Sequence, residues 1–67
     1  MPDYEIRLRG RLDPSWSAWF SDLIVQPTGG GETILSGPVA DQTALHGILE
    51  RIRDQALELL SLRRLDE

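Results

Sequence analysis

The stretch Tyr4–Leu12, with the sequence YEIRLRGRL, is the segment from which the fold is best worked out. Apolar residues or glycine occupy every second position from Tyr4, and charged residues occupy the positions between them. Such an alternation with a period of two is typical of a β-strand with one face buried and the other exposed. Gly10 weakens the far end of this strand and indicates a bulge or a close backbone approach. The chain is therefore predicted to begin with a half-buried strand.

A short helix is predicted directly after this strand. Asp13 is suited to the N-cap, and Pro14 to the first helical position, where a missing backbone N–H costs nothing. Apolar side chains then follow at spacings of three and four residues and mark one helical face: Trp16, Trp19, Phe20 and Leu23. Because a helix of about two to three turns does not persist alone in water, packing must hold it.

The middle of the chain predicts a hairpin and then a longer helix. Two short β-prone runs, 23–26 and 32–36, flank a loop that contains three consecutive glycines. Asp41 is suited to the N-cap of the following helix. Its apolar stripe recurs at helical spacing, at Ala44, Leu45, Ile48, Leu49, Ile52 and Ala56.

The leucine-dense segment 57–65 has two interpretations. Leucine favours helix, so the segment is compatible with an extension of the preceding helix. Its leucines would surround such a helix, however, rather than continue its stripe. We therefore predict a final strand, with the helical extension as the alternative.

Strand, helix, hairpin, helix and strand together predict one small α+β domain over residues 1–67. The expected architecture is a compact ferredoxin-like β-α-β-β-α-β fold, with a four-stranded antiparallel sheet and two helices on one face.

Composition excludes several classes of protein. The 67 residues include seven arginines, no lysine, 11 acidic residues and no cysteine, and the formal net charge is −4. Without cysteine there is no disulfide framework, cysteine-ligated zinc or cysteine nucleophile. No apolar run approaches the length of a membrane span, and the start of the chain is unlike a signal peptide, so we expect no membrane partner.

Five segments of the chain form a set that resembles a known family. They are YEIRLRG at 4–10, LDPSWSAWF at 12–20, GPVADQ at 37–42, ALHGIL at 44–49 and IRD at 52–54. The set is similar to a family of short, uncharacterised bacterial proteins over nearly the whole chain. The resemblance implies a stand-alone cytoplasmic bacterial protein and assigns no activity, so it carries over no functional residue. The chain departs from the family pattern at Gln55-Ala56, where we expect a glycine that closes the helix.

Two groups of side chains are candidates for binding. Arg7, Arg9 and Arg11 project from one strand face and are compatible with phosphate or nucleic acid. The acidic net charge and the lack of aromatic residues on that face argue against nucleic acid, and pairing with Glu32 or Glu58 across strands is the alternative.

His46 and Glu50 share a helix face at a spacing of four residues. They are the ligand candidates, either as an oriented base or as half of a metal site, with a solvated surface pair as the simpler interpretation. The three glycines lack the lysine and the helix that a phosphate loop requires. We assign no catalytic, cofactor-binding or metal-binding residue.

The preferred hypothesis is a non-enzymatic interaction module that forms a homodimer, with an unknown protein as another possible partner. The hairpin strands and the last strand carry apolar residues on both faces, and helices can cover only one face of the sheet. The candidate interaction surface comprises Arg7, Arg9, Arg11, Val25, Ile34 and Leu59. The alternatives are a small-molecule-binding or enzyme subunit with a cleft between protomers around His46, and a nucleic-acid binder that uses the arginines.

Overall fold

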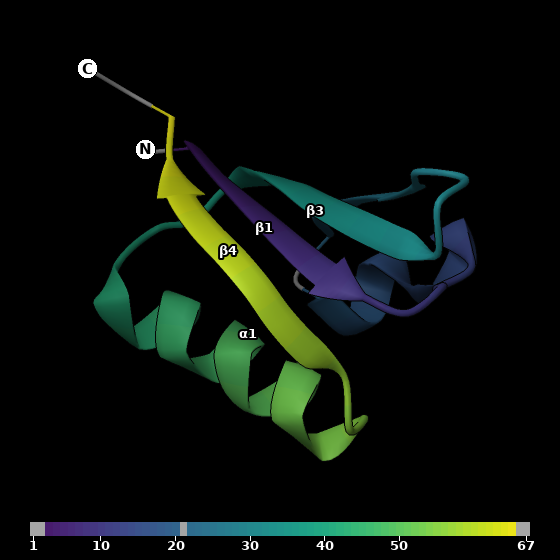
Figure 1. Ribbon diagram of the computed structural model, residues 1–67. Helices are drawn as coiled ribbons and strands as arrows, with labels where there is room; N and C mark the ends of the chain where they lie inside the picture. The colour runs from purple at the N-terminus through teal and green to yellow at the C-terminus, as the bar shows by residue number, and fades with distance from the viewer. Residues whose placement is uncertain (1–2, 21, 66–67) are drawn as a thin grey trace.

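The computed structural model describes residues 3–20 and 22–65. Its strands form one four-stranded antiparallel sheet in the order β2-β3-β1-β4, so that β2 and β4 are the edge strands (Figure 1). The strands are β1 (Asp3–Arg9), β2 (Ile24–Pro27), β3 (Glu32–Pro38) and β4 (Glu58–Arg64). A 3-10 helix, η1 (Pro14–Phe20), lies between β1 and β2, and an α-helix, α1 (Gln42–Asp54), lies between β3 and β4.

The strand predicted at the start of the chain is confirmed, and it occupies a central position in the sheet. β1 pairs with β3 on one side and with β4 on the other. Its alternating residues Tyr4, Ile6 and Leu8 are buried, whereas the charged residues between them are not. Hydrophobic burial on one face therefore sets the register of both neighbouring strands.

The core lies between this face of β1, the inner faces of β2 and β3, and the two helices. We call this face of the sheet the helix side and the opposite face the outer face. The buried hydrophobic residues form one cluster: Tyr4, Ile6, Leu8, Leu12, Phe20, Leu23, Val25, Leu35, Val39, Leu45, Ile48 and Ile52.

The prediction of a ferredoxin-like fold with two α-helices is wrong. The described residues contain one α-helix, and the segment after β1 is a 3-10 helix of seven residues. A segment of this length gains little from α-helical hydrogen bonding, and a spacing of three residues fits the 3-10 repeat. Trp16 and Trp19 accordingly form an edge-to-face pair with ring centroids 6.3 Å apart. Only Phe20 of η1 is fully buried, whereas Trp19 is 40% exposed.

Helix α1 begins where its sequence predicts. The Asp41 side chain accepts a 2.8 Å hydrogen bond from the backbone N–H of Ala44, as an N-cap residue does. Leu45, Ile48 and Ile52 are buried, and Ala44 and Leu49 pack against the core, which confirms the apolar stripe except at Ala56, which is exposed beyond the end of the helix. The chain turns away through Ala56, which has a positive φ of 58° at the place where a glycine was expected.

Beyond α1 the chain forms β4, so the strand interpretation of 57–65 is confirmed and the helical extension is wrong. Gly10 makes the close approach that its place in the sequence indicates. It has a φ of +123°, and a Cβ there would lie 3.1 Å from Leu57 Cδ2. The bulge falls instead on β4, where the register with β1 shifts between Arg7 and Leu8.

Candidate interaction surface

The outer face of β1 carries three ion pairs that connect it to its neighbours. Arg7 pairs with Glu32 of β3 at 3.1 Å. On the β4 side, Arg9 pairs with Glu58 at 3.1 Å and Glu5 pairs with Arg63 at 3.4 Å. The alternative of cross-strand pairing with Glu32 and Glu58 is therefore confirmed. Each pair is partly exposed and adds little stability, but two of the pairs neutralise Arg7 and Arg9, which were candidates for phosphate binding.

The structure does not gather the other residues of the candidate surface into one patch. Arg11 lies beyond the end of β1 and is exposed. Val25 is buried on the helix side, where it faces Leu35 across the ladder. Ile34 is half-buried and lies opposite Arg7 on the outer face. Leu59 lies opposite the buried Leu8 and therefore belongs to the helix side.

The exposed apolar surface follows β4 instead. Leu59 is 45% exposed and Leu62 is 38% exposed, and both lie opposite buried residues of β1. Leu65 follows the strand and is 45% exposed. We call these three residues the β4 leucines. They remain exposed because β4 is an edge strand of the sheet.

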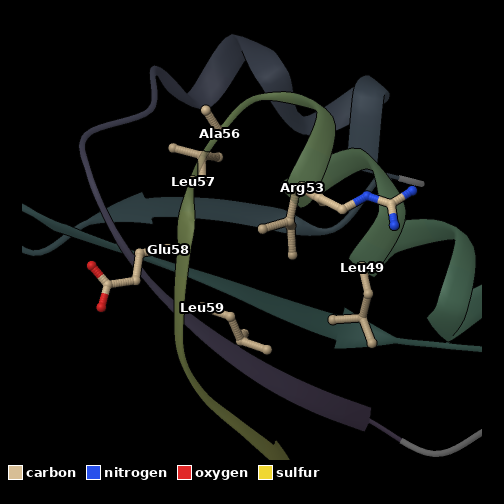
Figure 2. A pocket seen from close by; sticks show the side chains of 7 residues that line it. Leu49, Arg53, Ala56, Leu57, Glu58 and Leu59 are labelled. Atoms are coloured by element: carbon tan, nitrogen blue, oxygen red, sulfur yellow. The ribbon is translucent and has the colours of Figure 1, made fainter.

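An apolar groove of about 440 Å³ adjoins these leucines, between the end of α1 and the start of β4. In Figure 2, Leu49 of α1 and Leu59 of β4 both extend into the space between the two elements, whereas Glu58 extends to the other side of the strand. We call it the α1–β4 groove, and its lining comprises Leu49, Ile52, Arg53, Ala56, Leu57, Glu58 and Leu59.

The two edge strands differ in how freely another strand can pair with them. β2 has only four residues and ends in Pro27, which has no backbone N–H to donate. β4 has seven residues, none of them proline. Long edge strands without such protection readily pair with another strand. Among the described residues, β4 is therefore the open edge of the sheet.

His46 and Glu50 lie together, as the spacing of four residues predicts. Both are exposed on α1 and line an open depression of about 480 Å³ with Gln42, Thr43 and Gly47. Within residues 3–20 and 22–65, no group of three or more His, Cys, Asp or Glu side chains could hold a metal ion. The depression offers one imidazole and one carboxylate on a solvated helix face.

Leu62 and Leu65 are parts of the exposed surface that were not predicted from the sequence. A signal for Leu62 exists, because Leu59, Ser61, Leu62 and Arg63 alternate between apolar and polar once Leu60 is set aside. Leu60 is the residue of β4 that has no partner in the ladder with β1. The inserted residue hides a strand-like alternation inside a run that looks uniformly leucine-rich.

A family model matches most of this chain, so the chain belongs to that family. That family is described as a domain of unknown function (DUF8691), and its model matches residues 3–63. No match to the chain was found among curated proteins or among solved structures. No helix among the described residues is long and apolar enough to cross a membrane.

Proposed function

We propose that this protein is a non-enzymatic interaction module and that it associates with a second copy of itself through β4. The observation that carries the proposal is the exposure of Leu59 and Leu62 along an edge strand that pairs with β1 on one side only. Isolated exposed leucines are ordinary, but an apolar row beside a groove and an open backbone edge is typical of a contact surface. A second β4 supplies both a backbone ladder and apolar side chains.

Size supports the same proposal. A domain of about 67 residues buries a modest fraction of its unfolded surface and commonly needs a disulfide, a metal or an oligomer contact. The chain contains no cysteine and a single histidine, which leaves association and unusually tight packing as the available devices. The bacterial origin and the cytoplasmic location that the resemblance implies belong to this proposal as well.

The alternative sites have less support. The ion pairs on the outer face neutralise Arg7 and Arg9, which lowers their value as ligands for a nucleic-acid backbone. His46 and Glu50 occupy an open depression whose other lining residues are Gln42, Thr43 and Gly47, so it lacks the large apolar side chains typical of small-molecule sites. The α1–β4 groove has such side chains, and it adjoins the open edge of β4.

The test is the solution mass of the full chain, measured by sedimentation equilibrium from micromolar to millimolar concentration. We expect the mass to rise towards that of two chains as the concentration increases. Leu59→Glu should hold the mass at one chain, because it places a charge in the contact. Ile24→Glu is the matched control, since Ile24 is 63% exposed on the opposite edge strand and should leave the association unchanged. A wild-type mass of one chain at every concentration would refute the proposal.

A further inference from the structure

We infer that the two copies pair through β4 in one antiparallel register, in which Leu59 faces the partner's Leu62 and Glu58 faces the partner's Arg63. This inference rests on the proposed self-association and specifies its geometry. The two-fold axis then passes between Leu60 and Ser61, at the bulge of the strand.

The bulge determines which side chains share a face. Ser61 lies opposite Arg7 and Leu59 lies opposite Leu8, so Leu60 is an extra residue between them. Two sets of side chains follow from the ladder with β1. Those on the helix side are Leu59, Leu62 and Arg64, and those on the outer face are Glu58, Ser61 and Arg63. The alternation of faces along β4 is thus broken once, at Leu60.

A strand that pairs with this edge must match the broken alternation, because residues directly opposite one another in an antiparallel ladder lie on the same face. A regular strand from another protein matches the faces on both sides of Leu60 only by leaving Leu60 without a partner, as β1 does. A second copy carries the same break. When the two breaks meet at the axis, Leu59 and the partner's Leu62 both lie on the helix side, and Glu58 and the partner's Arg63 both lie on the outer face.

Neighbouring registers fail the same requirement. A shift by one residue places Leu59 opposite the partner's Arg63 or the partner's Ser61, whose side chains point to the other face. Only the register in which Leu60 of each copy lies at the two-fold axis therefore places opposite residues on the same face along the whole strand.

Charge favours the same arrangement. β4 has Glu58 at its start and Arg63 near its end, so antiparallel pairing brings opposite charges together twice, whereas parallel pairing in register brings like charges together. Glu58 also pairs with Arg9, and Arg63 with Glu5, within one chain. On each side of the axis, the interface thus joins the Arg9–Glu58 pair of one copy to the Glu5–Arg63 pair of the other copy on the outer face.

The helix side supplies the apolar part of the contact. Leu59 extends into the space between β4 and α1, where Leu49 also extends (Figure 2). The partner's Leu62 beside it closes this end of the α1–β4 groove. Two symmetric leucine pairs, one on each side of the axis, bury the side chains that the single chain leaves exposed.

Cysteine cross-linking tests the register, because the chain has no cysteine of its own. Leu59→Cys and Leu62→Cys are prepared separately, mixed and oxidised gently. We expect the mixed disulfide to form at least about tenfold faster than either homodisulfide, because two copies of position 59 are about 10 Å apart in this register, too far for a disulfide. Ile24→Cys mixed with Leu62→Cys is the control for random collision.

Charge reversal gives a second measurement that does not depend on oxidation. Glu58→Arg or Arg63→Glu alone should raise the concentration at which half of the dimer dissociates by about tenfold, and the double variant should recover most of that loss. In the double variant, the new arginine at position 58 still repels Arg9, and the new glutamate at position 63 still repels Glu5, within each chain. A recovery of affinity therefore comes from the contact between the two subunits.

The results of these experiments test the strand register and the self-association separately. A wild-type dimer by mass, combined with equal rates for the mixed and the single disulfides, would overturn the register and leave self-association standing. A wild-type monomer at every concentration would overturn both. Preferential mixed disulfides, together with recovery in the double variant, support the register.

Discussion

Arg51 of α1 donates a 2.6 Å hydrogen bond from Nη1 to the carbonyl oxygen of Trp19, and its guanidinium lies 5.0 Å from the centroid of the Trp19 ring. One side chain thus binds both the backbone and the ring of the 3-10 helix. Trp19 is exposed, so its contribution comes from this contact with α1 more than from burial in the core.

Arg51→Ala should lower the free energy of unfolding by about 1–2 kcal/mol, because it removes a charged hydrogen bond and a cation–π contact at a partly exposed site. Urea unfolding followed by tryptophan fluorescence measures the loss. Arg53→Ala, an exposed arginine of the same helix, is the control and should change stability by less than about 0.5 kcal/mol. Equal effects of the two substitutions would contradict the assignment.

Thr33 is a fully buried polar residue that fastens the end of β1 to β3. Its hydroxyl donates a 2.7 Å hydrogen bond to the carbonyl oxygen of Gly10 and accepts a 3.0 Å hydrogen bond from the backbone N–H of Leu12. Thr33→Val should cost about 2–3 kcal/mol of unfolding free energy, because it leaves a donor and an acceptor unsatisfied. Thr28→Val, at an exposed hydroxyl, should cost less than about 1 kcal/mol. Chemical denaturation of both variants measures these losses of unfolding free energy. A Thr33→Val variant as stable as the wild type would refute the stabilising role of the Thr33 hydroxyl.

Ala56 occupies the left-handed region with a φ of 58°, where a side chain is strained. Ala56→Gly should therefore raise the free energy of unfolding by about 0.5–1 kcal/mol, although glycine also increases the entropy of the unfolded chain. Ala40→Gly is the control, because Ala40 is exposed and has no positive φ to relieve. That variant should be neutral or less stable in thermal unfolding. A loss of stability in Ala56→Gly would show that the strain is small.

The carboxyl group of Asp13 should make the free energy of unfolding depend on pH. The backbone N–H of Ser15 donates a 2.9 Å hydrogen bond to its carboxylate, and this bond, followed by the Ser15 hydroxyl, lowers the pKa of Asp13 below its ordinary value of 3.8. A pKa that is lower in the folded state contributes stability above the unfolded pKa, and this contribution is lost as the pH falls through the folded value.

The wild type should therefore lose stability relative to Asp13→Asn as the pH falls below 3.8, and the difference should be constant above it. Asparagine keeps an oxygen that can cap the 3-10 helix but does not titrate. Urea unfolding of both proteins between about pH 6 and pH 2 provides the comparison. A difference that is independent of pH across this range would contradict the prediction.

Several features could be predicted because they depend on residues close together in sequence. The alternation of Tyr4, Ile6 and Leu8 determined the face of β1, and Asp41 determined the start of α1. The segment 14–20 was harder, because over two turns a spacing of three residues does not distinguish an α-helix from a 3-10 helix. The prediction of a second α-helix failed for this reason.

The candidate surface depended on contacts that no local pattern encodes. The sequence determined by itself that 57–65 is leucine-rich, that β1 carries a row of arginines and that cysteine is absent. Only the tertiary structure decided that Arg7 and Arg9 meet glutamates, that Val25 is buried, and that Leu59 and Leu62 lie exposed on the helix side. The physical reason is the bulge at Leu60 together with the position of β4 at the edge of the sheet. Strand order and register are set by packing between distant segments, and they determine which apolar side chains remain in contact with water.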